Sequence, residues 1–78
     1  MRLEGELVFT YKSRKTAGDV AGLIELDNLI APKTLRIRTG AKDADVVTRL
    51  ASEKASTFFA TVDDLFFSER LITELLET

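Results

Sequence analysis

Hydrophobic and polar residues alternate along the first segment of the chain, residues 2–12. Leu3, Leu7, Phe9 and Tyr11 fall on one face of this segment, and mostly charged or polar residues fall on the other. A period of two residues over such a length is typical of a half-buried β-strand. We therefore predict a strand here, with these four side chains turned toward the interior.

The period then changes to that of a helix, over residues 14–27. Its apolar stripe, at the spacing i, i+3, i+4, i+7, consists of Ala17, Val20, Ala21 and Ile24. Ser13 is placed to cap the helix N-terminus, and Pro32 requires the helix to end before it. Gly18 and Gly22 lie beside the stripe, where they indicate either close packing against a neighbour or a tolerated glycine.

Alternation returns over residues 34–39 and again over 45–51, with turn residues at 40–43 between them. These two segments predict a hairpin. We place Val46, Thr48 and Leu50 of the third strand inward, and the reverse register stays open because Val47 is also apolar. The first strand, helix and hairpin together form the first part of an α+β pattern.

A long helix closes the chain, with Ser56 or Thr57 as its N-cap. At about 100° per residue, one stripe faces the protein's own sheet; it consists of Phe58, Val62, Leu65, Ile72 and Leu76, flanked by Phe59, Phe66 and Leu75. Phe67 and Leu71 point the other way, among charged residues. A helix that is apolar on two sides needs packing partners on both sides. So short a chain supplies one of them, and we expect another protein to supply the second.

The predicted element order is β-α-β-β-α, and the fold class is α+β. The simplest packing is a three-stranded antiparallel sheet with both helices on one face, in a single domain that spans residues 1–78. The edges of such a small sheet are open and invite a further strand from a partner.

Composition argues against an enzyme. The chain contains no histidine and no cysteine, so the commonest general base, the thiolate nucleophile and the usual zinc ligands are absent. The adjacent Asp63 and Asp64 point about 100° apart on a helix and cannot form a catalytic pair. We expect no catalytic residue, metal or cofactor. No signal peptide or membrane-spanning stretch is visible, and we expect a cytoplasmic protein.

Glu69 falls in the middle of the apolar stripe of the last helix. Two interpretations remain open at this point. In the first, the helix is locally kinked, or the Glu69 stem lies along the surface with its carboxylate in water. In the second, the carboxylate meets a basic group on a partner.

Basic residues gather in two stretches, although the net charge of the chain is −2. The candidates for an RNA contact are Lys12, Arg14, Lys15, Lys33, Arg36 and Arg38. No aromatic residue is interleaved with them on the open face of the sheet, and Glu4 and Glu6 lie nearby, which favours a solvated face. A small stand-alone RNA-binding module is the alternative function.

Two segments of the chain resemble a known family. One is Leu26-Asp27-Asn28 followed by Pro32 and the second strand; the other is Ser52-Glu53 followed by Thr61-Val62-Asp63-Asp64-Leu65. Both are similar to the small Pcc-type subunit of the archaeal and eukaryotic KEOPS complex, and the resemblance covers residues 7–77. The chain departs from many members by Phe58-Phe59-Ala60 in place of an Arg, and by its acidic pair in place of Asn-Ser.

The resemblance implies a non-catalytic scaffold. Such subunits dimerise through their sheets and use their helices to hold the Kae-type catalytic subunit of a complex that transfers a threonylcarbamoyl group to tRNA. It implies that the helix segment around Thr61, Asp63, Asp64, Phe67 and Leu71 faces the catalytic partner. The partner interface that we predict consists of Phe59, Asp63, Asp64, Phe67, Arg70 and Leu71. The partners would be a Pcc-type subunit in a homodimer or heterodimer, the Kae-type subunit, and tRNA through the complex. The acidic pair favours a basic partner surface.

Overall fold

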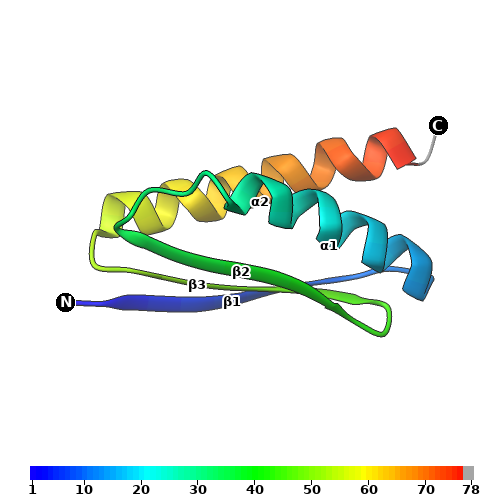
Figure 1. Cartoon of the computed structure of the whole chain (residues 1–78), viewed down its shortest axis with the longest axis horizontal. Coiled ribbons are helices and arrows are strands. Elements are labelled where there is room, and N and C mark those ends of the chain that lie inside the picture. Colours follow the sequence, from blue (N-terminus) through cyan, green and yellow to red (C-terminus); the bar gives the residue numbers. More distant parts are fainter. Residues whose placement is uncertain (77–78) are drawn as a thin grey trace.

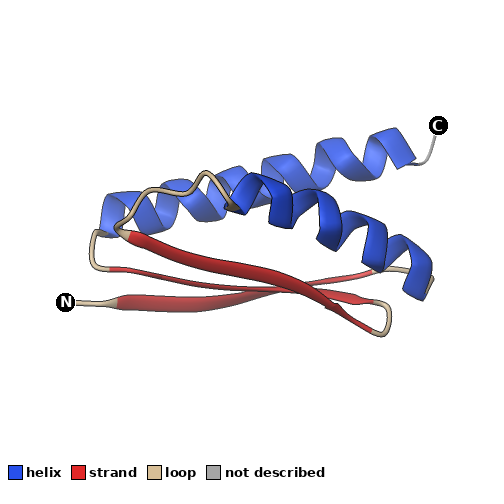
Figure 2. Cartoon of the chain, in the orientation of Figure 1, coloured by secondary structure: helices blue, strands red, loops and turns tan. Residues whose placement is uncertain are grey.

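Five secondary-structure elements follow one another in the computed structural model, which describes residues 1–76 (Figure 1). They are β1 (Leu3–Thr10), α1 (Arg14–Asn28), β2 (Leu35–Lys42), β3 (Asp45–Ser52) and α2 (Ala55–Leu76). The helices lie side by side over one face of the sheet, and the other face is uncovered (Figure 2). The predicted α+β class and element order are confirmed.

The sheet is antiparallel throughout, with β3 between β1 and β2. Thr48 in the central strand pairs with Leu7 on one side and with Thr39 on the other. Val46, Thr48 and Leu50 are all buried beneath the helices, so the predicted register of the third strand is confirmed. The alternation of side chains along each strand therefore decides which face the helices cover.

The core is formed mainly by α1 and the central strand. The four apolar residues predicted for the stripe of α1 are all buried. From α2, only Leu65 is fully buried, while Phe58, Val62 and Ile72 pack half-buried against the core. Leu76 was predicted to face the sheet, and this prediction is wrong. The helix α2 rises away from the sheet toward its C-terminal end (Figure 1) and leaves the Leu76 side chain 44% exposed.

The largest differences from the predicted boundaries are at the end of β2 and at the start of α2. Pairing with β3 carries β2 through to Lys42, so the turn shortens to two residues, in which Asp43 adopts a φ of 54°. The cap predicted at Ser56 or Thr57 is also wrong. The last helix begins at Ala55, and the Phe58 N–H already donates to the Lys54 carbonyl. The Ser52 hydroxyl accepts from the Lys54 N–H instead.

Ser13 caps α1 as predicted, since its hydroxyl accepts from the Thr16 N–H at 3.1 Å. Gly18 and Gly22 are tolerated glycines, because a Cβ at either would meet no atom within 4 Å. Gly5 in β1 is different. A Cβ there would lie 2.9 Å from the Phe58 ring, so the missing side chain lets α2 approach the sheet.

A polar cluster joins α1 to the sheet at the β2 edge of the apolar core. The Thr39 and Thr48 hydroxyls lie 2.7 Å apart, and the Asn28 amide donates to Thr39 Oγ1 at 2.9 Å. Glu25 accepts from the Thr39 N–H at 2.8 Å. No buried side-chain nitrogen or oxygen of the described residues lacks a partner. These bonds fix how α1 sits over β2.

We predict that Leu65→Ala lowers the free energy of unfolding by about 2–5 kcal/mol, because it leaves a cavity at the one fully buried position of α2. The matched control is Phe67→Ala on the same helix, where the side chain is 64% exposed and the change should stay within about 0.5 kcal/mol. Urea unfolding followed by circular dichroism measures both. Equal effects of the two substitutions would contradict the assignment of the core.

Candidate protein interaction surface

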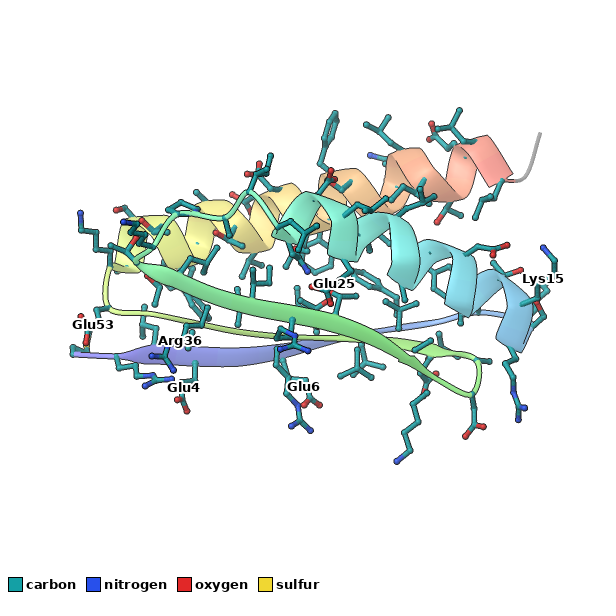
Figure 3. The ribbon with its side chains drawn as sticks, viewed as in Figure 1. Glu4, Glu6, Lys15, Glu25, Arg36 and Glu53 are labelled. Atoms are coloured by element: carbon teal, nitrogen blue, oxygen red, sulfur yellow. The ribbon has the colours of Figure 1, made fainter. Side chains whose placement is uncertain are left out.

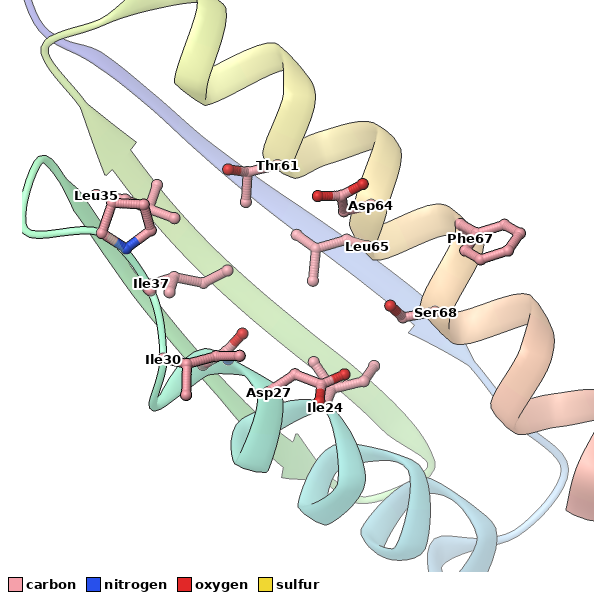
Figure 4. Close-up of a pocket in the computed structure, with 13 residues that line it drawn as sticks. Ile24, Asp27, Ile30, Leu35, Ile37, Thr61, Asp64, Leu65, Phe67 and Ser68 are labelled. Atoms are coloured by element: carbon pink, nitrogen blue, oxygen red, sulfur yellow. The ribbon is translucent and has the colours of Figure 1, made fainter.

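A groove of about 290 Å³ separates the C-terminal half of α1 from the middle of α2 (Figure 4). Its floor is apolar and includes Ile24, Leu35 and Leu65. Thr61, Asp64 and Ser68 point from α2 toward α1, whereas the Phe67 ring stands at the rim and points away from it (Figure 4). The groove exists because α1 and α2 each bury a single stripe and do not close over one another.

Exposed apolar side chains lie on both helices near this groove. Ile30 and Phe67 line it, and Leu23 and Leu71 fall on the sides of α1 and α2 that face it. Leu26 and Leu29 are also exposed but lie farther round α1, away from the groove. Ile30 is the most exposed of the six, at 86%. Contiguous apolar surface rimmed by polar groups marks a site where another protein binds. We call the groove and the four side chains that adjoin it, Leu23, Ile30, Phe67 and Leu71, the interhelical surface.

The polar groups of the interhelical surface are acidic. Asp27 and Asp64 line the groove, and neither forms an ion pair within residues 1–76. Two free carboxylates beside apolar side chains match a partner helix that carries both basic and apolar residues. The geometry suits docking, and it offers no positioned acid, base or nucleophile.

The structure divides the predicted partner interface between two sides of α2. Asp64, Phe67 and Leu71 lie on the side of the interhelical surface, and Asp63 lies at the exposed crest. Phe59 and Arg70 fall on the opposite side, nearer β1. A single helical projection from sequence could not separate these sides, since it does not show where α1 lies.

The contribution of α1 was missing from the sequence-based interface. Leu23, Leu26, Leu29 and Ile30 are apolar, yet they fall outside the buried stripe of α1. That surplus is the same signal that identifies α2 as a helix with an external partner. It could have been found by asking of both helices, and not only of the last one, whether apolar residues lie on more than one side.

The β1 side of α2 carries a second apolar area. Phe66 packs edge-on against Phe9 of β1, with ring centroids 5.6 Å apart, and still remains 51% exposed. Phe59 lies two turns earlier on the same side of the helix and is 60% exposed. Both rings are on the β1 side of α2, away from the interhelical surface, and the Phe66 ring contacts β1 itself.

Glu69 forms an intramolecular contact that neither sequence-based interpretation included. The Tyr11 hydroxyl donates to Glu69 Oε1 at 2.7 Å, and the Thr73 hydroxyl donates to the same oxygen at 2.9 Å. Burial, and next the hydrogen bond to Glu69, raise the pKa of Tyr11 from 10.0 to about 12. The contact joins the C-terminal half of α2 to the end of β1.

The six predicted RNA contacts do not form one patch. Lys12, Arg14 and Lys15 lie near the β2–β3 turn, where Arg14 pairs with Asp43 and Lys15 pairs with Asp19. Lys33 and Arg36 lie at the other end of the sheet, in the loop before β2 and at its start, and Arg38 lies at the middle of β2. Figure 3 shows Lys15 and Arg36 at these separate ends.

The open face of the sheet is of mixed charge. Arg36 lies there beside Glu4 and Glu6 (Figure 3). Arg2 pairs with Glu4 at 3.0 Å, and Arg49 pairs with Glu6 at 2.8 Å. These acidic groups lower the positive potential that a nucleic-acid backbone requires. Within the described part of the chain, no helix is both long and apolar enough to cross a membrane.

No protein-family model matches this sequence, and no curated protein matches it. Among solved structures, a chain in the crystal structure of the binary complex Gon7-Pcc1 is similar, with a TM-score of 0.84. The match covers 96% of this chain and 93% of that chain, at 13% sequence identity. The two chains share a fold. At this identity the match shows that the two architectures are alike, and it gives no information on the role of any individual residue.

We predict that Tyr11, the single tyrosine of the chain, titrates near pH 12 in ultraviolet absorbance and that Glu69→Gln moves this midpoint toward 10.0. A raised pKa stabilises the fold below pH 10.0, and the contribution is lost as the pH rises from 10.0 to about 12. Tyr11→Phe should remove this part of the pH dependence. An unshifted midpoint in both proteins would contradict the contact.

Proposed function

We propose that this protein is a non-catalytic scaffold subunit of a KEOPS-type complex, which supports threonylcarbamoyl modification of tRNA. The observation that carries the proposal is the interhelical surface, where exposed apolar side chains of two helices flank an acidic groove. Such a surface binds a protein and performs no chemistry.

The fold supports this proposal in one respect. The similar solved structure is titled as a binary complex of Gon7 and Pcc1, so a chain of this shape functions there as one member of a protein pair. The sequence resemblance to the Pcc-type subunit points to the same complex. We infer that this chain likewise pairs with a Pcc-type subunit, in a homodimer or a heterodimer.

We infer further that the interhelical surface holds the Kae-type catalytic subunit. The groove has an apolar floor and exposed apolar side chains beside it. These features suit the helix-in-groove mode of recognition, in which an amphipathic helix lays its apolar face between two others. Asp27 and Asp64 would then meet lysine or arginine on that helix. Binding of tRNA would occur through the assembled complex, since the basic residues of this chain are divided between two ends.

The test is copurification of the Kae-type subunit with a double variant, Phe67→Asp with Leu71→Asp. Both side chains are exposed, so the fold should survive while two buried carboxylates are placed in the interface. We expect loss of the catalytic subunit from the double variant. The control is Phe59→Asp, which lies on the other side of α2 and should retain it.

Retention of the catalytic subunit by the double variant, at the level of the unmodified protein, would overturn the assignment of this surface. Circular dichroism of each variant shows that the fold is intact. Tight binding of tRNA by the isolated protein, with a steep dependence on salt, would instead favour the stand-alone RNA-binding module.

A further inference from the structure

The outer edge of β2 carries backbone groups that the sheet does not use. The Thr39 N–H donates away from β3, to Glu25 of α1 at 2.8 Å. Since the two backbone groups of a residue share one direction and neighbouring residues alternate, the outward residues of β2 are Leu35, Ile37, Thr39 and Ala41. The Leu35 N–H donates to a carbonyl of the preceding loop at 3.0 Å. Within residues 1–76, the N–H groups of Ile37 and Ala41 have no partner.

A row of basic side chains follows this edge on the open face of the sheet. Arg36, Arg38 and Lys42 are exposed there, and Figure 3 shows Arg36 among them. In the part of the chain that the structure describes, none of the three forms an ion pair, whereas the arginines closer to β1 are paired with its glutamates. Gly40 interrupts the row, and a hollow of about 540 Å³ lies between Arg38 and Lys42. We call these three side chains the basic row.

The covered side of the same edge is apolar and has room beside it. Leu35 is buried there, and Ile37 packs half-buried against the core. Gly18 and Gly22 lie about two turns and one turn before Glu25, on the same side of α1. A Cβ at either glycine would meet no atom within 4 Å. The side chains of a strand added beside β2 would therefore meet apolar residues and no obstruction from α1.

We propose that the outer edge of β2 binds an extended segment of a partner protein in which acidic and apolar residues alternate. The segment adds to the sheet as a further strand, through the outward backbone groups of Ile37, Thr39 and Ala41. Its acidic side chains lie beside the basic row, and its apolar side chains turn toward α1. The inference goes beyond the proposed function, because this edge is separate from the interhelical surface.

Charge and spacing both select an acidic strand. Alternate residues of a strand are about 6.8 Å apart, so carboxylates at alternate positions repeat at the interval of Arg36 and Arg38. Opposite charges on neighbouring strands stabilise a sheet, and like charges destabilise it. The same segment is disfavoured at the edge of β1, because the open face there carries Glu4 and Glu6. Charge therefore directs the segment to β2.

A single-stranded nucleic acid fits the basic row less well. Proteins that bind single strands combine basic groups with aromatic side chains on which the bases stack. The three strands contain one aromatic residue, Phe9, and it packs against the core under the helices. The unused N–H groups of Ile37 and Ala41 suit the carbonyl groups of a peptide. The observations thus favour a peptide strand.

Glu25 restricts access to this edge. Its carboxylate accepts from the Thr39 N–H, where a carbonyl of the added strand would have to bind, and it also accepts from the Asn28 amide at 3.4 Å. Its negative charge opposes an acidic segment as well. A partner must displace this carboxylate, which protects the edge from unspecific pairing. Glu25 is therefore a specificity-determining residue of the site, and its removal should strengthen binding.

The probe is a peptide of 8 residues, the length of β2, in which Glu and Val alternate. Its control has the same composition with all Glu residues in one block. Isothermal titration calorimetry of the full chain should detect weak binding of the alternating peptide only. Glu25→Ala should bind it about tenfold more tightly, because no hydrogen bond to a charged group has to be broken. Glu25→Gln, which keeps an acceptor without the charge, should fall between the two.

Proline substitutions in the Glu25→Ala background locate the edge. Ala41→Pro removes an N–H that points outward, so the internal ladder stays intact while strand addition is blocked. We expect this variant to lose the peptide. Val8→Pro, at an outward position on β1, is the matched control and should retain it. Circular dichroism shows that each variant is folded.

Charge reversal in the same background tests the basic row. Arg36→Glu with Arg38→Glu should abolish binding of the alternating peptide, because its carboxylates would then lie beside carboxylates. Lys12→Glu with Lys15→Glu makes the same change in net charge outside β2 and should retain binding.

Four results would overturn the proposal. They are no binding by Glu25→Ala, equal binding of the block peptide, undiminished binding by Ala41→Pro, and growth of Glu25→Ala into multimers without peptide, which would make a second copy the occupant. Tight binding of a single-stranded oligouridylate that the arginine reversal removes and Ala41→Pro does not would also overturn it, because the basic row would then bind nucleic acid.

The variant Phe67→Asp with Leu71→Asp separates this inference from the proposed function. Both residues lie on α2, so the variant should bind the peptide as the unmodified protein does. If it keeps the peptide and loses the catalytic subunit, both proposals hold. If the peptide tests fail while the catalytic subunit is lost, only the β2 site is wrong. The reverse pattern overturns the scaffold assignment and leaves the β2 site in place.

Discussion

The structure depends on one packing constraint: a three-stranded sheet can bury only one stripe of each helix that lies on it. The helix α1 buries one stripe of small and branched residues, with Val20 and Ile24 in the same core as Val46, and leaves Leu23 and Leu26 exposed. The longer α2 exceeds the limit further, because its apolar residues surround more than half of the helix axis and only Leu65 is fully buried. The polypeptide thus retains apolar surface that its own fold cannot cover.

The uncovered apolar side chains of α2 lie in two places. On one side of the helix they adjoin the exposed residues of α1 and form the interhelical surface, with Asp27 and Asp64 as its free charges. On the other side Phe59 and Phe66 lie beside the open edge of β1. Because the two areas are on opposite sides of one helix, a protein built this way can hold two different partners at once. That arrangement is what a scaffold requires.

The contact between Tyr11 and Glu69 joins α2 to β1. It holds the C-terminal half of α2 at the end of β1, although that half of the helix rises from the sheet (Figure 1). The polar cluster around Thr39 has a comparable role at the other edge, where Glu25 joins α1 to β2 and closes the strand edge at the same time. Polar bonds thus help to fix the positions of the helices at the two edges.

Much of the fold could be predicted because strand and helix periods are local. The register of β3 and the buried stripe of α1 follow directly from the alternation of apolar residues. The contacts that join distant segments could not be predicted. The Tyr11–Glu69 bond spans 58 residues of sequence, and nothing in the local pattern of either residue indicates the other. For the same reason, sequence placed Phe59 with Phe67 in one interface, which the three-dimensional arrangement divides.

The central claim is that this chain is a scaffold with two separate protein-binding surfaces. Native mass spectrometry of the protein alone, and then after mixing with the Kae-type catalytic subunit, tests it most directly. The account predicts that the 8.7 kDa chain gains the catalytic subunit while it remains paired with a Pcc-type subunit, which in a homodimer is its own second copy. A monomer that gains nothing on mixing would contradict it.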